Sequence, residues 1–131
     1  MTESKQKHKK LVIGGQIIKA GEEKEIHLPT LKLYTDTEMS LPIHVKRGKK
    51  SGPTLLVCGA IHGDELNGVE VIRRLLKKRR LLRQLRGDLL AIPVVNIPAF
   101  LGRSRYLPDR RDLNRLFPGS CLLYTSDAAD D

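Results

Sequence analysis

The feature that most constrains the fold is a pair of apolar runs separated by an amphipathic segment. The first run, Thr54–Ala60, reads TLLVCGA, and the second, Leu89–Asn96, reads LLAIPVVN. Between them, apolar residues recur at helical spacing, which predicts a helix from about Glu65 to about Arg80. A strand, a helix and a strand in this order predict a βαβ unit with parallel strands. Because Thr54–Ala60 carries no charge, we expect it to be a central strand buried on both faces.

Shorter β-type runs precede this unit, and turn residues such as Gly21 and Pro29 separate them. The runs are Leu11–Ile18, Glu25–Leu28, Leu31–Thr35 and Leu41–Gly48. They predict a small antiparallel β region that leads into the core. We therefore expect an α/β fold with a mixed, largely parallel sheet that is flanked by helices on both faces.

The composition limits the class of protein. The chain has 131 residues, of which 40% are hydrophobic, and this is enough for one domain with a modest core. No apolar stretch approaches the roughly 20 residues of a membrane span, and the N-terminus, MTESKQKHKKLVIGG, has no apolar signal region. Cys58 stands alone in an apolar run, which favours a free thiol in a reducing compartment. We expect a cytoplasmic protein.

Ionisable side chains gather where the first apolar run meets the helix. His62 and Glu65 lie three residues apart in the sequence, and Gly63 between them allows a tight turn, so both side chains can converge on one point. A neutral imidazole nitrogen and a carboxylate oxygen are both good zinc ligands. The alternative is that Asp64 or Glu65 caps the helix and that His62 belongs to no site.

Arginines are concentrated between Ile97 and Ser120, a segment that we expect to be a long loop where α/β sheets bind ligands. The arginines are Arg103, Arg105, Arg110, Arg111 and Arg115. Their planar forks suit carboxylates, and Asn114 adds a donor and an acceptor. Asp109 and Asp112 can hold the arginines in place. A solvated loop is the alternative, but it would not need the apolar residues Tyr106, Leu107, Leu113, Leu116 and Phe117.

The motifs AIHGDELNGVEVIRRLL, PVVN and SRYLPDRRDLNRLFPGS together resemble the succinylglutamate desuccinylase/aspartoacylase family of zinc hydrolases, which are relatives of the zinc carboxypeptidases. The resemblance covers roughly residues 15–120 and implies a zinc-carboxypeptidase-like fold. It implies that His62 and Glu65 are the first two zinc ligands and that Arg105 polarises the scissile carbonyl. Asn114 and Arg115 match the pair that binds the substrate carboxylate. The family's third ligand, a later histidine, and its general-base glutamate have no matching position in this sequence.

The resemblance also implies the function. We expect a deacylase with one Zn²⁺ per site that cleaves the amide bond of a small N-acyl amino acid or a related carboxylate. The segment between Arg105 and Asn114 is longer than in the aspartoacylases proper, which argues against N-acetylaspartate as the substrate. A zinc carboxypeptidase that acts on peptides is the alternative on the same fold. The sequence leaves the acyl group, the amino acid and the oligomeric state open.

A basic run, Lys77–Arg80, is followed by Arg83 and Arg86 and suggests a further alternative, a nucleic-acid-binding module. The chain has a net charge of +9, which attracts polyanions in general. Only 4% of the residues are aromatic, however, so a platform for stacking bases is not evident. Cations at the C-terminal end of a helix complement its dipole, and we favour a solvated helix end.

This interpretation divides the chain into three expected parts. Residues 1–10 form a mobile basic arm, residues 11–120 form the N-terminal part of a single catalytic domain, and residues 121–131 form a non-native tail. The tail, CLLYTSDAADD, resembles the translation of an adapter used in sequencing libraries, and a short natural tail is the alternative. With two zinc ligands and no base, the chain is expected to be an inactive fragment that binds zinc weakly. Without later strands and helices to cover the sheet, the apolar strands Thr54–Ala60 and Leu89–Val95 are expected to keep an exposed edge or face, which favours aggregation and poor solubility.

Overall fold

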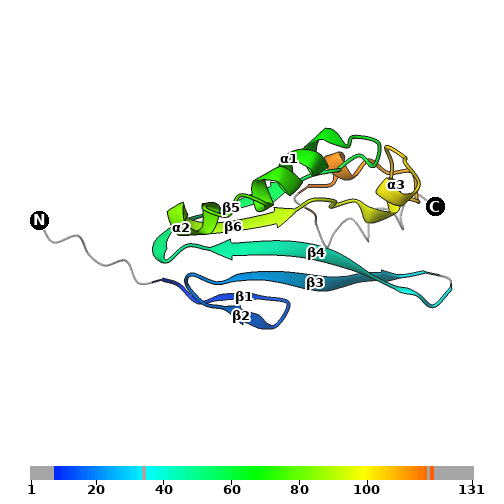
Figure 1. Cartoon of the computed structure of the whole chain (residues 1–131). Coiled ribbons are helices and arrows are strands. Elements are labelled where there is room, and N and C mark those ends of the chain that lie inside the picture. The colour runs from blue at the N-terminus through cyan, green and yellow to red at the C-terminus, as the bar shows by residue number, and fades with distance from the viewer. Residues whose placement is uncertain (1–7, 34, 118, 120–131) are drawn as a thin grey trace, which may run out of the picture.

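The computed structural model describes residues 8–33, 35–117 and 119, so most of the expected arm and all of the expected tail lie outside it. Strands β1 (Leu11–Ile13) and β2 (Gln16–Ile18) pair as a hairpin. The main sheet has the order β3–β4–β6–β5, and these strands are Glu23–Lys32, Glu38–Arg47, Arg86–Ile92 and Lys50–Cys58. The helices are α1 (Asn67–Leu76), α2 (Leu81–Gln84), α3 (Ile97–Leu101) and the 3₁₀ helix η1 (Leu113–Arg115) (Figure 1).

The N-terminal β region is antiparallel, as the sequence predicts, but its strands have other bounds. The expected run Leu11–Ile18 is two strands, because Gly14 and Gly15 adopt φ angles of 55° and 75° and turn the chain back on itself. The two strands expected on either side of Pro29 form one long strand, β3, whose register against β4 shifts after this proline. Pro29 is tolerated there because β3 is an edge strand, which leaves one side of its backbone unpaired.

The expected βαβ unit is present. Strands β5 and β6 are parallel, with Leu55 opposite Leu89 and Cys58 opposite Ile92, and α1 lies between them in the chain. α1 is shorter than expected because the chain first makes a turn through Glu65 and breaks again before α2. The α/β fold with a mixed sheet is confirmed, although β5–β6 is the one parallel pair among the described strands of this sheet and β3–β4 and β4–β6 are antiparallel.

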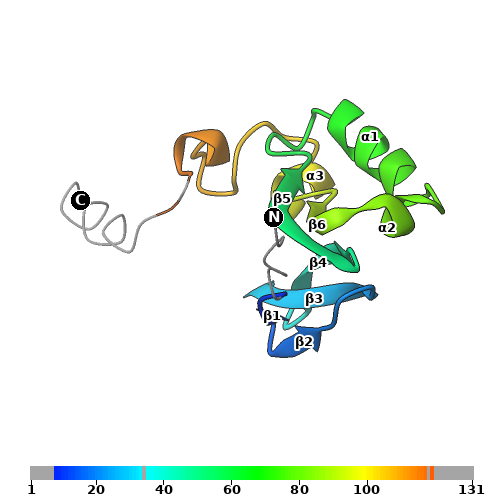
Figure 2. The ribbon, with the colours of Figure 1, turned by 90° about the vertical axis from the view of Figure 1, so that its left-hand side faces the viewer.

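β5 lies at the edge of the described sheet, with α1 and α2 on one side of it (Figure 2). Among the described residues β5 is therefore not a central strand buried on both faces, because Leu55 is 60% exposed and Leu56 is 55% exposed. It has the exposed edge and faces that were expected of this run in a fragment. Successive side chains of a strand point to opposite faces, so both faces of β5 are open here. The order of strands depends on pairing between remote segments, and an apolar run alone does not contain that information.

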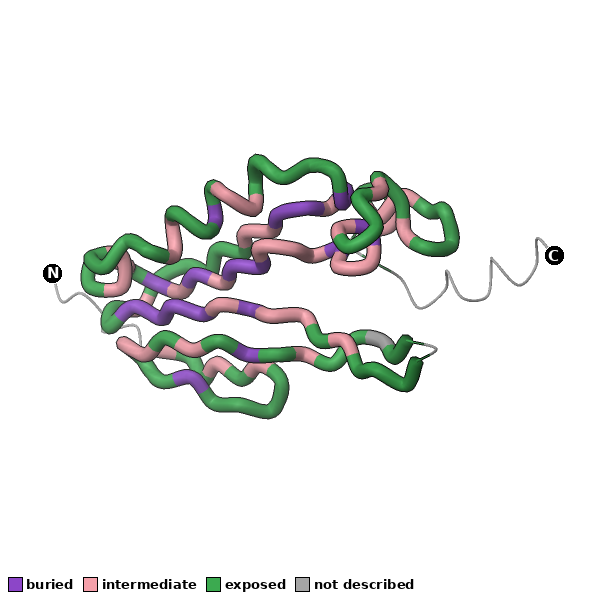
Figure 3. Tube along the Cα trace, turned by 45° about the vertical axis from the view of Figure 1, so that its right-hand side comes forward, coloured by how far each residue is buried: buried purple, intermediate pink, exposed green. Residues whose placement is uncertain are grey.

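Buried positions are concentrated along β4 and β6, with exposed positions along β5 (Figure 3). The core cluster is Ile18, Ile26, Ile43, Val45 and Ile92. Arg47, only 4% exposed, joins the hairpin to the sheet, since its guanidinium donates to the Ile18 carbonyl at 2.6 Å and to the Asp88 carboxylate at 3.2 Å. The same guanidinium also donates to the carbonyl of Lys9, which attaches the end of the expected arm to β4.

α1 combines one buried side chain with an exposed network of charges. Ile72 is 2% exposed, whereas Glu70 pairs on the surface with Arg73 and Arg74, whose hydrogen bonds lower the pKa of Glu70 to about 2. The basic run Lys77–Arg80 follows α1 and is exposed along its whole length. None of the helices in the described part of the chain has the length and apolar character needed to cross a bilayer.

The open edge of β5 leads to a prediction about association. Replacing Leu55 and Leu56 with threonine is expected to reduce self-association of the chain, because an exposed apolar edge strand pairs readily with other copies. Threonine keeps a high β propensity, so the strand should persist. Light scattering and size-exclusion chromatography at matched concentration would measure the change. Leu89→Thr, at a buried position of β6, should instead lower the melting temperature, and unchanged association of the double variant would contradict the prediction.

Candidate functional site

The loop after β5 carries His62 and Glu65 on the same side. Gly59, the first residue after β5, still donates its N–H to the Ile92 carbonyl of β6 at 2.9 Å, so the first residue of the loop is held against β6. The N–H of Glu65 then bonds to the carbonyl of His62 at 3.1 Å and closes a turn. Within that turn, Nδ1 of His62 lies 3.0 Å from Oε1 of Glu65. The structure therefore brings together the two residues that were expected to bind zinc, at the C-terminal end of β5.

The second nitrogen of His62 contacts a residue that is remote in the sequence. Nε2 of His62 lies 2.9 Å from Oδ1 of Asp112, although 50 positions separate the two residues. His62 is 6% exposed, and the Asp112 side chain is 15% exposed. The carboxylates of Glu65 and, to a lesser extent, Asp112 accept hydrogen bonds from the imidazole and raise the pKa of His62, and the bond to His62 holds the pKa of Asp112 below its ordinary value. The imidazole is thus fixed at both of its nitrogens.

Arg105 lies beside the same two carboxylates. Its Nη1 is 3.6 Å from Oε1 of Glu65, and its Nη2 is 3.8 Å from Oδ2 of Asp112. The Arg105 side chain is 46% exposed, so part of the guanidinium faces solvent next to His62. Asp112 was expected to hold arginines in place, and it does lie beside Arg105, but its shortest side-chain contact is with the imidazole.

Asn114 and Arg115 form most of η1, which Asp112 starts. Oδ1 of Asp112 accepts a hydrogen bond from the backbone N–H of Asn114 at 3.0 Å, so the oxygen that binds His62 also caps this turn. The segment of η1 therefore folds back toward His62. The side chains of Asn114 and Arg115 are both exposed, and neither makes a hydrogen bond or an ion pair with another residue in the described ranges.

The chemistry of these groups fits a zinc ion. Two ligands of a tetrahedral zinc with bonds of about 2.0–2.1 Å lie about 3.3 Å apart, close to the 3.0 Å between His62 Nδ1 and Glu65 Oε1. A carboxylate on the opposite nitrogen, here Asp112, is the usual partner of a zinc-bound histidine. Among the residues that the structure describes, no group of three His, Cys, Asp or Glu side chains is arranged to hold a metal ion. A zinc ion held by His62 and Glu65 would therefore need at least one further ligand.

Sequence comparison identifies the family. The profile of the succinylglutamate desuccinylase/aspartoacylase catalytic domain matches residues 51–131. The chain belongs to this family. It is similar to the N-alpha-acetyl-L-2,4-diaminobutyric acid deacetylase of Halomonas elongata, with 40% identity over 76 residues, which are 57% of this chain and 21% of that protein.

Solved structures of the succinylglutamate desuccinylase/aspartoacylase family share the fold. A succinylglutamate desuccinylase from Silicibacter sp. TM1040 matches with a TM-score of 0.63 and 33% identity, over 76% of this chain and 30% of that chain. The product-bound ectoine utilization protein EutE (DoeB) from Ruegeria pomeroyi matches with a TM-score of 0.57 and 32% identity, over the same shares of the two chains. The chain thus spans about 30% of the length of these relatives.

The sequence did not indicate the positions of two residues, Asp112 against His62 and Asn96 beneath the loop that carries it. Asp112 was assigned to the arginines, and Asn96 was noted only as the last residue of the PVVN motif. Asn96 is 1% exposed, and its side chain bonds to the Ile61 carbonyl and to the N–H of Ala99. The signal that was available is an Asn directly before Ile-Pro, which is a helix-capping pattern. The expected long loop accordingly begins with a short helix, α3, and contains η1.

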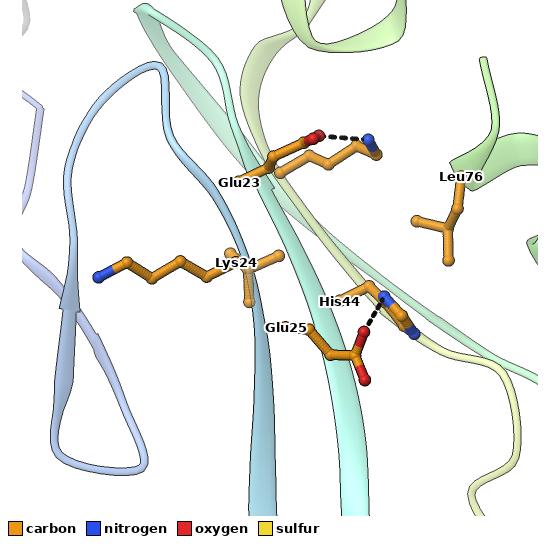
Figure 4. Close-up of a pocket in the computed structure, with 7 residues that line it drawn as sticks. Glu23, Lys24, Glu25, His44 and Leu76 are labelled. Carbon is orange, nitrogen blue, oxygen red and sulfur yellow. Dashed lines mark hydrogen bonds and ion pairs between the residues drawn. The ribbon is translucent and has the colours of Figure 1, made fainter. Parts of the chain in front are cut away.

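His27 and His44 lie on β3 and β4, outside the cluster of His62, Glu65, Arg105 and Asp112. His44 lines a hollow of about 300 Å³ over β3 and β4, beside Glu25 at 3.7 Å (Figure 4). In the same hollow, Glu23 pairs with Lys46 at 2.6 Å. His27 contacts Glu25 at 3.0 Å on the same strand. These contacts link neighbouring side chains of β3 and β4 to one another.

Proposed function

We propose that the chain supplies part of the active site of a zinc-dependent deacylase that hydrolyses the amide bond of a small N-acyl amino acid. The observation that carries the proposal is the arrangement around His62: Glu65 on one nitrogen, Asp112 on the other, and Arg105 beside both carboxylates. Membership of a family whose named relatives include a deacetylase and a desuccinylase supports this reaction class.

Each of the four residues around the His62 imidazole has a role in this proposal. His62 and Glu65 would hold zinc, which when bound acts as a Lewis acid and lowers the pKa of a water toward about 7. With zinc bound, Asp112 would accept a hydrogen bond from Nε2–H of His62, which would leave the lone pair of Nδ1 for the metal on the side of Glu65. Arg105 would donate to the carbonyl oxygen as negative charge develops there, a contribution on the order of 3–4 kcal/mol for a single oxyanion donor.

Substrate orientation falls to η1 in the same proposal. Arg115 presents a fork that matches a carboxylate, and Asn114 adds an amide donor, and both side chains are exposed. Because Asp112 ties η1 to His62, a carboxylate held there would place the scissile amide close to the metal ligands. The Halomonas relative is named for an acetylated diaminobutyric acid, so we propose N-acetylated amino acids as the first class to test.

Zinc and ligand binding test the proposal on the chain itself. We expect zinc to bind weakly, and we expect His62→Ala and Glu65→Ala to abolish binding while His44→Ala leaves it unchanged, as measured by competition with a chromophoric chelator. An N-acetyl amino acid should shift the NMR signals of Arg115, and its carboxamide, which lacks the carboxylate, should not. Zinc binding that survives loss of His62, or equal binding of acid and carboxamide, would refute the proposed site. An N-acetyl dipeptide that binds better than the amino acid would favour a peptidase instead.

A further inference from the structure

We propose that Asn96 is a positioning residue that fixes His62 and Arg105 relative to each other through the two ends of one buried amide. Asn96 follows β6 and precedes α3, and its side chain is among the most buried of the described chain, with the residue 1% exposed. It touches neither His62 nor Arg105 directly. It acts instead on the backbone of Ile61, which precedes His62. Through α3 it also acts on the backbone of Ser104, which precedes Arg105.

The donor end of the amide holds the loop of His62. Nδ2 of Asn96 donates to the carbonyl of Ile61 at 2.9 Å, and Ile61 directly precedes His62. The backbone N–H of Asn96 also bonds to the carbonyl of Ala60 at 3.3 Å. Two successive carbonyls of the loop are therefore bound to one residue, which limits rotation of the peptide units that aim the imidazole.

The acceptor end of the amide holds the start of the segment that carries Arg105. Oδ1 of Asn96 accepts the N–H of Ala99 at 3.3 Å and caps α3. The carbonyl of Ala99 in turn accepts the N–H of Ser104 at 2.8 Å, and Ser104 directly precedes Arg105. The position of Arg105 beside Glu65 and Asp112 thus depends on α3 being held at its first turn.

An asparagine is well suited to this position. A primary amide carries two donors and an acceptor on one short side chain, so a single residue can bind a carbonyl on one side and an N–H on the other. Serine also accepts from a helix N–H, but its shorter side chain does not reach the Ile61 carbonyl. The two functions can therefore be separated: serine should keep the cap on α3 and lose the hold on the His62 loop, whereas alanine should lose both.

The experiment compares Asn96→Ser, Asn96→Ala and the wild-type chain by NMR and by zinc competition. In Asn96→Ser, we expect shifted signals for Ile61 and His62, unchanged signals for Ala99 to Ser104, and a 10- to 100-fold loss of zinc affinity, the usual effect of removing support from a metal ligand. In Asn96→Ala, both sets of signals should shift. Ile43→Val is the control, since it trims a buried residue of β4 away from the site and should lower the melting temperature without changing zinc affinity.

The zinc arm of this inference rests on the proposed function, and the NMR arm does not. If the wild-type chain binds no zinc, the proposed function fails, while the signals of Ile61 and His62 still decide the role of Asn96. Unchanged signals for these residues in Asn96→Ser would overturn the inference whatever zinc does. A loss of zinc affinity in Ile43→Val as large as in Asn96→Ser would overturn it too, because the effect would then follow global stability.

Discussion

Replacing Gly63 with alanine is expected to displace the loop of His62 from α3 and to lose zinc binding. A Cβ at position 63 would overlap the backbone carbon and oxygen of Ala99 and the backbone nitrogen of Phe100. None of these atoms belongs to a flexible side chain, so the loop or the helix must move as a unit. Overpacking of this kind costs about 1–3 kcal/mol in cores, and backbone contacts place Gly63 at the upper end of that range or beyond it.

Thermal unfolding and zinc competition would measure the effect of Gly63→Ala. Gly68→Ala is the matched control, because a Cβ at position 68 would meet only the Cα of Gly59 at an ordinary distance of 3.6 Å. That position is within α1, where alanine is the better helix former, so the control should unfold at the wild-type temperature or above it. If Gly63→Ala has the melting temperature and zinc affinity of the wild type, the close approach of the loop to α3 is not present in solution.

Gly63 also illustrates what the sequence could and could not provide. Its place between His62 and Glu65 indicated a tight turn, and the spacing of those two residues indicated that their side chains converge, because both properties are local. The atoms that require a glycine belong to Ala99 and Phe100, about 36 residues away along the chain, and no local pattern points to them. The family resemblance gave Gly63 no role.

The same division between local and remote information applies to the fold. Apolar periodicity predicted β5, α1 and β6 and their parallel pairing, because a strand, a helix and a strand in close succession allow few arrangements. It did not predict that β5 lies at the edge of the described sheet, since strand order depends on pairing between segments that are remote in the sequence. The hairpin β1–β2 could have been predicted from Gly14 and Gly15, which together permit a turn that few other residues adopt.

Replacing Asp112 with asparagine is expected to weaken zinc binding 10- to 100-fold, or about 1.4–2.7 kcal/mol, without unfolding η1. The amide oxygen of asparagine can still accept from the N–H of Asn114 and from Nε2–H of His62, so the turn and the tautomer are retained. What is lost is the negative charge that makes His62 a more basic ligand. His62→Ala removes the ligand itself and should abolish binding altogether.

A carboxylate in the same segment provides the control for Asp112→Asn. The Asp109 carboxylate accepts from Arg111 twice, with Oδ2 bound to Nε at 2.6 Å and Oδ1 bound to the backbone N–H at 3.0 Å. In the described part of the chain, the side-chain partners of the His62 imidazole are Glu65 and Asp112, so Asp109→Asn removes the same charge from the same loop without touching that contact. If charge near the site were the cause, both variants would lose affinity equally. We expect Asp109→Asn to bind zinc like the wild type, because the effect of Asp112 passes through one hydrogen bond to His62. Equal losses in the two variants, measured by chelator competition at fixed pH and ionic strength, would show that Asp112 acts by general electrostatics and not as the partner of a metal ligand.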